Sequence, residues 1–150
     1  MNIPRVDHMA IRFFRHISIP LARISLFVIY FWFGILKVIG LSPASGLVYA
    51  LYNQTIPFVP FHAFYLAFAL FECLIGILFL IKGAERIVIP LLLAHLITTI
   101  LPLIFLPDMA WQHWFVPTLE GQYIIKNLAL ITAAIAIAAH LHPLPHKIEK

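Results

Sequence analysis

The sequence has little charge. Asp, Glu, Lys and Arg make up 11% of its 150 residues, whereas hydrophobic residues make up 63%. Soluble domains average about 25% charged and about 45–50% apolar residues. Because a soluble fold of this length leaves a large part of its surface in water, it cannot bury so many apolar side chains. The composition therefore excludes a soluble enzyme, a disordered tail and a nucleic-acid-binding module.

The sequence also lacks the usual motifs of catalysis and cofactor binding. It contains one cysteine, Cys73, which excludes an intrachain disulfide and a CxxC redox pair. It contains no Ser-His-Asp arrangement, phosphate-binding loop or glycine-rich nucleotide fingerprint. We therefore predict no catalytic residue and no cofactor held within the chain, and the sequence does not favour an enzyme.

Three long stretches contain no charged residue. They run from Lys37 to Glu72, from Arg86 to Asp108 and from Lys126 to Lys147. About 20 apolar residues in a helix cross a bilayer core of about 30 Å. Four segments meet that length, at about residues 18–40, 61–82, 87–106 and 122–142. The sequence predicts an all-α, polytopic membrane protein whose residues 1–150 form a single domain, a bundle of four transmembrane helices.

The basic residues are confined to alternate sides of these spans. Loops 41–60 and 107–121 contain no Lys or Arg. The other side carries these basic residues: Arg5, Arg12, Arg15, Lys82, Arg86, Lys147 and Lys150. Since positive residues favour the cytoplasmic side of a membrane, we predict that the N and C termini are cytoplasmic and that both longer loops lie outside.

Two segments outside the spans have amphipathic patterns. Residues 1–17 are either a short interfacial helix with a basic face or a frayed basic tail. In loop 41–60, Ser42 and Pro43 favour a helix start, with Leu47 and Leu51 on one face. We expect an extra interfacial helix there, lying on or dipping into the outer surface.

The second outer loop is aromatic. Trp111, His113 and Trp114 lie close together in it. Two tryptophans beside a span are typical of the aromatic belt at the headgroups. The alternative is a lid whose residues contact a ligand at the outer face.

Histidines offer only weak metal motifs. The tract His140, His142 and His146 is interpreted as an interfacial tail rather than a metal site. A second candidate set on the outer side has no diagnostic spacing: His62, Asp108, His113 and Glu120. A haem held by two histidines is not expected, because His95 is the only histidine in the middle of a predicted span. We therefore predict no metal site.

Polar residues inside the spans are the main functional candidates, because intramembrane ionisable groups face the bundle interior and pair. Glu72 lies about 16 Å below the outer end of its helix, and His95 lies at nearly the same depth on the next span. We predict one buried polar cluster near Thr98 and Thr99, with these members: Glu72, His95, Lys37, Lys126 and Asn127. It is either a structural ion pair that sets helix register or a proton-handling or ligand-binding pocket that opens outward.

Small residues share helical faces with these polar ones. Gly34 lies on the stripe that contains Arg23 and Lys37 in the first span, and Gly76 lies on the stripe of Glu72 in the second. Small residues allow membrane helices to approach closely. We expect both stripes to be packing surfaces.

Several short segments resemble one known family. The first span has Arg23 and ends in residues 34–37, Gly-Ile-Leu-Lys; the second has Phe71-Glu72, then Gly76 and Lys82-Gly83; the last opens with residues 121–123, Gly-Gln-Tyr, and 126–128, Lys-Asn-Leu. These segments together resemble the DoxX-like superfamily of small four-helix membrane proteins. The resemblance implies a compact four-helix bundle that works alongside partners. The family takes its name from a subunit of a terminal quinol oxidase, and relatives are linked to redox stress, membrane-complex assembly and protein export.

Two functions remain open from the sequence. The first is an accessory or assembly subunit of a membrane complex of the respiratory or redox kind, with other membrane subunits as partners. The second is a quinone- or small-solute-binding protein that uses the buried Glu, His and Lys cluster for proton exchange. In either case the partners include the lipid bilayer and exclude nucleic acid. The family resemblance favours a bacterial inner (plasma) membrane.

Overall fold

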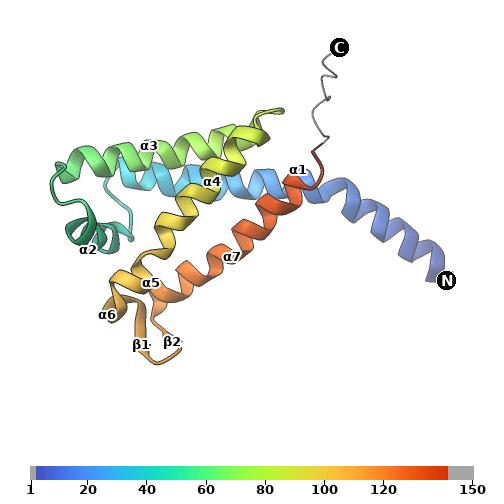
Figure 1. The fold of residues 1–150 in the computed structure, drawn as a ribbon. Helices are drawn as coiled ribbons and strands as arrows, with labels where there is room; N and C mark the ends of the chain where they lie inside the picture. Colours follow the sequence, from blue (N-terminus) through green and yellow to red (C-terminus); the bar gives the residue numbers. More distant parts are fainter. Residues whose placement is uncertain (1–2, 142–150) are drawn as a thin grey trace, which may run out of the picture.

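The computed structural model describes residues 3–141, and it is almost entirely helical (Figure 1). The elements follow in this order: α1 (Ile3–Val38), α2 (Ser45–Thr55), α3 (Phe61–Leu80), α4 (Glu85–Ile100), α5 (Pro102–Phe105), α6 (Pro107–Ala110), β1 (Trp111–His113), β2 (Val116–Pro117) and α7 (Leu119–Ala138). Strands β1 and β2 form a small antiparallel hairpin. The predicted all-α class is confirmed.

Four helical segments of the described residues are long and apolar enough to cross a membrane. They are Val6–Val38, Phe61–Leu80, Glu85–Phe105 and Leu119–Ala138. The predicted multi-pass membrane bundle is thereby confirmed. The last helix begins three residues earlier than predicted, because the Thr118 hydroxyl accepts a hydrogen bond from the Gly121 amide at 3.1 Å and caps it.

The first helix differs from the prediction. The described part of the segment 1–17 is not a separate interfacial helix or a frayed tail: from Ile3 onward it continues without a break into the span. No glycine interrupts the chain before Gly34, and Pro20 leaves the helix continuous although it removes one backbone donor. The change from a basic to an apolar sequence therefore marks a change of surroundings and not a helix end.

Helices α1 and α3 lie side by side and antiparallel (Figure 1). Two glycines make this approach possible. A Cβ at Gly34 would lie 2.9 Å from the Ala69 carbonyl oxygen, and one at Gly76 would lie 2.7 Å from the Phe31 amide nitrogen. Each glycine therefore packs directly against the backbone of the other helix.

Helices α4 and α7 cross the first pair obliquely (Figure 1). All four spans contribute to one apolar core: Leu26, Tyr30, Ile75, Phe79, Val88, Ile89, Leu92, Leu96, Ala134 and Ile137. Most of these residues lie towards the end of the bundle that carries Lys82 and Arg86, which we call the basic end. We call the opposite end, with α2, α5, α6 and the β-hairpin, the hairpin end.

The extra helix predicted between the first two spans is present as α2. It begins at Ser45, three residues after the expected cap, and Ala44 precedes it without a side-chain cap bond. Ser42 instead accepts a bond from the Ala44 amide at 3.3 Å, which supports the turn before the helix. Tyr52 anchors α2 to α3, because its ring packs 5.1 Å from Phe61 and its hydroxyl donates to the Val59 carbonyl.

Candidate functional site

Three polar side chains from three helices meet inside the bundle. Lys37 comes from the last turn of α1, Glu72 from the middle of α3 and His95 from α4. They are 7%, 5% and 4% exposed. The opposite directions of α3 and α4 place Glu72 and His95 at matching depth, as the sequence spacing predicted.

The carboxylate of Glu72 joins the other two groups. Its Oε2 accepts a hydrogen bond from the Lys37 ammonium at 2.6 Å, and its Oε1 lies 3.1 Å from Nε2 of His95. An ionised carboxylate only accepts hydrogen bonds, so a neutral His95 facing it carries its proton on Nε2. Each carboxylate oxygen thus has one donor, and we call these three residues the Lys37–Glu72–His95 triad.

The other ring nitrogen of His95 has no partner. Nδ1 is buried and makes no hydrogen bond within the described residues. With the proton on Nε2, Nδ1 presents a lone pair. Buried polar atoms are nearly always satisfied, so an unpaired one indicates an additional donor that the chain does not supply. A hydroxyl group or a water molecule has the right chemistry.

Aromatic rings enclose the triad. Phe68 stacks on the His95 ring at 5.1 Å, and Tyr30 meets it edge-on at 5.3 Å. The Lys37 ammonium lies 5.8 Å from the Phe68 centroid, which adds a cation–π contact. These apolar walls lower the local dielectric constant and strengthen the polar contacts within them. The sequence analysis did not place these rings at the site.

The rings continue to the hairpin end. Phe68 contacts Phe64 at 5.8 Å, and Phe64 contacts Tyr52 of α2 at 5.7 Å. An aromatic column therefore connects α2 with His95.

Two predicted members of the cluster lie elsewhere. Lys126 is exposed, and its ammonium lies 5.1 Å from the ring centroid of Tyr123, so its place in a buried cluster was wrong. Asn127, the next residue, is half-buried and donates to the Thr99 hydroxyl at 3.1 Å. This bond connects α7 to α4 beside the triad. Within the described residues, Asn127 makes no hydrogen bond to the triad itself. Its position around the helix turns Lys126 outward.

Thr98 also belongs to the surroundings of the triad and not to its contacts. Its hydroxyl donates to the carbonyl of His95 at 2.6 Å. This bond is local to α4 and ties the threonine to its own helix turn. Among the described residues, the buried polar cluster therefore consists of Lys37, Glu72 and His95, and the threonines are not members of it.

A second ion pair was missed by the sequence analysis. Arg23 of α1 forms a hydrogen-bonded ion pair with Glu85, the first residue of α4. Both side chains are mostly buried at the basic end of the bundle. The signal was available, because Arg23 and Glu85 carry opposite charges at similar depth. The prediction assigned the charges near residues 82–86 to membrane orientation alone.

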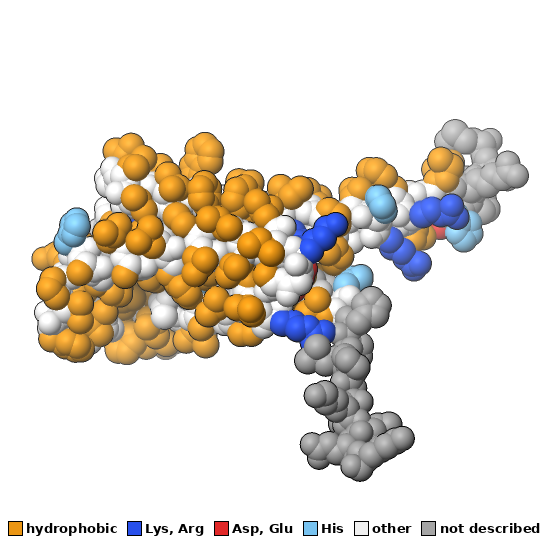
Figure 2. Space-filling model, turned by 90° about the horizontal axis from the view of Figure 1, so that it is seen from above, with side chains coloured by type: hydrophobic (Ala, Val, Ile, Leu, Met, Phe, Trp, Pro, Cys, Tyr) orange, Lys and Arg blue, Asp and Glu red, His pale blue; other side chains and the backbone are white. Residues whose placement is uncertain are grey.

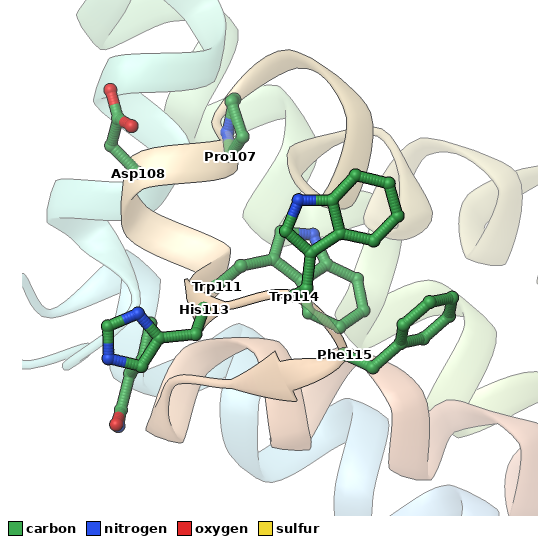
Figure 3. A pocket seen from close by; sticks show the side chains of 7 residues that line it. Pro107, Asp108, Trp111, His113, Trp114 and Phe115 are labelled. Atoms are coloured by element: carbon green, nitrogen blue, oxygen red, sulfur yellow. The ribbon is translucent and has the colours of Figure 1, made fainter.

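The predicted ligand contacts of the outer loop lie in the β-hairpin. Trp111, His113 and Trp114 border an open hollow of about 460 Å³ (Figure 3). The Trp111 indole donates to the Leu103 carbonyl at 3.0 Å, which anchors this ring to the bundle, whereas Trp114 is 90% exposed. In Figure 3, His113 and Asp108 point in different directions. The hollow thus has aromatic walls without a converging set of polar groups.

Candidate metal ligands do not gather. Within residues 3–141, no three His, Cys, Asp or Glu side chains are placed to hold a metal ion. The proposed outer set around His62 and Asp108 is therefore not assembled. His140 bonds to the Ala136 carbonyl at 2.8 Å through Nδ1, while His142 and His146 lie outside the described residues.

Comparisons with known proteins leave the family open. No family model, curated protein or solved structure matches this chain. The resemblance to the DoxX-like superfamily stays a prediction, and the function has to be argued from the triad and its surroundings.

Proposed function

We propose that this membrane protein binds a small lipophilic molecule that carries a hydroxyl group, of the quinol class, and exchanges a proton with it. The unpartnered Nδ1 of the buried His95 carries the proposal. A quinol suits the position in two ways. Its hydroxyl is a donor for the lone pair of Nδ1, and its ring is compatible with the aromatic surroundings formed by Tyr30 and Phe68.

The triad has the parts that proton exchange requires. When the ligand hydroxyl donates to Nδ1, its proton moves to the imidazole and its oxygen keeps the bonding electron pair. The imidazolium that forms is held through Nε2 by Glu72, at 3.1 Å. The Lys37 ammonium donates to the other carboxylate oxygen of Glu72, at 2.6 Å. Glu72 thus orients and stabilises His95 in the way a carboxylate supports a catalytic histidine.

A purely structural ion pair would not require His95. Lys37 and Glu72 alone connect α1 to α3, and a buried pair of opposite charges requires no third group. His95 adds a titratable ring whose second nitrogen is left unsatisfied, which is unfavourable by about 1–3 kcal/mol when no partner is bound. A ligand that donates a hydrogen bond to Nδ1 while the protein functions would account for this unsatisfied nitrogen.

Binding by the purified protein tests this proposal. In detergent micelles, a short-chain quinol should bind saturably, and His95→Ala should weaken the binding at least tenfold because the acceptor is lost. Lys126→Ala is the matched control, since that side chain is exposed and outside the triad; it should bind like the parent chain. Circular dichroism and thermal unfolding would check that both variants fold. Equal quinol affinity in folded His95→Ala protein would refute the proposal.

A second candidate function is an accessory or assembly subunit of a respiratory or redox membrane complex in a bacterial inner membrane. The tip of the β-hairpin supports it. Trp114 and Phe115 are 90% and 85% exposed, and Phe115 has a backbone φ of 55°, a strained conformation for a bulky residue. A neighbouring subunit covering this tip would account for both features. Co-migration with a large complex in native membranes, lost in Trp114→Ala, would distinguish it from a protein that binds quinol alone.

A further inference from the structure

The first helix is longer than a helix needs to be to cross the hydrocarbon core of a membrane. Its 36 residues extend about 54 Å, against a hydrocarbon core of about 30 Å. Residues 6–17, which we call the N-terminal arm, reach past the basic end of the bundle and pack against no other helix (Figure 1). No residue of the arm is buried.

The arm has two distinct faces. Val6, Met9 and Phe13 recur at spacings of three and four residues, so they share one face, where they are 50%, 72% and 58% exposed. Ala10, Phe14 and Ile17 widen that face. The opposite face carries His8, Arg12 and Arg15, all exposed. A basic amphipathic helix of this kind is typical of segments that lie on a membrane surface.

Pro20 lies between the arm and the bundle. Its ring removes the amide hydrogen that would bond to the carbonyl of residue 16, and such a loss lets a helix bend. Figure 1 shows the arm leaving at an angle to the rest of α1. Because the arm diverges from the helix axis here, its apolar face can turn towards the bilayer while α1 remains a single helix.

We infer that the N-terminal arm is a docking surface for anionic phospholipid headgroups of the leaflet at the basic end of the bundle. Charge complementarity identifies the occupant. Arg12 and Arg15 face away from the apolar residues, and Lys82 and Arg86 add positive charge at the same end. Figure 2 shows Lys and Arg side chains gathered at this end of the molecule. The apolar face enters the headgroup region, and the arginines contact phosphate groups. Each arginine near an anionic surface raises the docked population about fivefold.

The test uses the full chain in lipid vesicles with a single spin label. In a Cys73→Ser background, Phe13→Cys places the label on the apolar face and His8→Cys places it on the basic face. In vesicles containing phosphatidylglycerol, the label at position 13 should be accessible to oxygen and shielded from a water-soluble nickel chelate. The label at position 8 should show the reverse.

Removing the arginine charges tests whether anionic headgroups hold the N-terminal arm at the membrane. Arg12→Gln together with Arg15→Gln should reduce the ratio of docked to free arm about 30-fold, as should vesicles of phosphatidylcholine alone. Lys126→Gln is the matched control, because it removes an exposed cation from another part of the chain and should leave the ratio unchanged. The inference fails if position 13 is water-exposed in anionic vesicles, if neutral vesicles dock the arm equally well, or if docking requires an added soluble protein.

Discussion

The two helix pairs of this bundle are held together by different means. In the α1–α3 pair, Gly34 and Gly76 bring the backbones into direct contact, and the thiol of Cys73 lies 3.9 Å from the Phe31 carbonyl. In the α4–α7 pair, packing involves small residues such as Ala134 near the basic end, and Asn127 donates a hydrogen bond to Thr99 further along. The first pair is held by direct backbone contact, and the second joins it through the shared apolar core and through polar side chains.

The triad lies where these two pairs meet. Lys37 and Glu72 belong to the first pair, and His95 belongs to the second. Arg23 and Glu85 repeat this connection at the basic end. We expect a site between a closely packed pair and a pair with fewer close backbone contacts to keep its charges in place while its histidine adjusts to a ligand. The following experiments test that contrast.

The largest effect is expected from removal of the Lys37 ammonium. Lys37→Met should destabilise the protein by about 3–5 kcal/mol, because it leaves the buried Glu72 carboxylate without its cation. Unfolding by sodium dodecyl sulphate in mixed micelles, followed by circular dichroism, measures the loss. Adding Glu72→Met should recover most of it, since no unpaired charge then remains in the triad. A double variant as unstable as the single one would show that charge pairing is not the cause.

A smaller effect is expected from a methyl group between α1 and α3. Gly34→Ala should cost about 1–3 kcal/mol, because the new Cβ would lie 2.6 Å from the Cys73 thiol and 2.9 Å from backbone atoms. The same unfolding titration applies. Gly46→Ala in α2 is the control, because a Cβ there meets no atom within 4 Å, and it should be neutral or slightly stabilising. If both variants behave alike, the close contact of the first pair is not important for stability.

The smallest effect is expected in the second pair. Asn127→Ala removes the bond to Thr99 and should cost about 0.6 kcal/mol, the average for interhelical hydrogen bonds in a membrane protein. Lys126→Ala, one residue away and exposed, should change stability very little. A loss at Asn127 as large as that at Gly34 would remove the distinction between the two pairs.

The fold was largely predictable because charge is so scarce. Apolar segments of about 20 residues located all four spans to within a few residues, apart from the start of α1. That start was misplaced because composition changes sharply near residue 17, whereas helix continuity depends on backbone signals. Pro20 is a possible helix-breaking signal between Ile3 and Val38, and the helix continues through it.

The sequence predicted how far along each helix the site residues lie, but not the direction in which each side chain faces. Counting residues from the helix ends placed Glu72 and His95 together, and the structure brings them within 3.1 Å. The same count placed Lys126 near them, yet that side chain faces outward. Rotation about a helix axis is set by neighbours, here by Asn127 reaching Thr99, and a sequence alone does not show which neighbour a helix meets. The aromatic rings around His95 escaped prediction for the same reason.

The ion pair between Lys37 and Glu72 also bears on how the chain enters the membrane. The two residues lie on the first two spans to be synthesised, with only α2 between those helices. If these spans insert as a hairpin, each charge meets its counterion before α4 exists, so the cost of carrying a lone lysine or glutamate into lipid is reduced from the start. His95 then arrives at a pair that is already neutral. The order of the helices along the chain thus makes the buried charges compatible with stepwise membrane insertion.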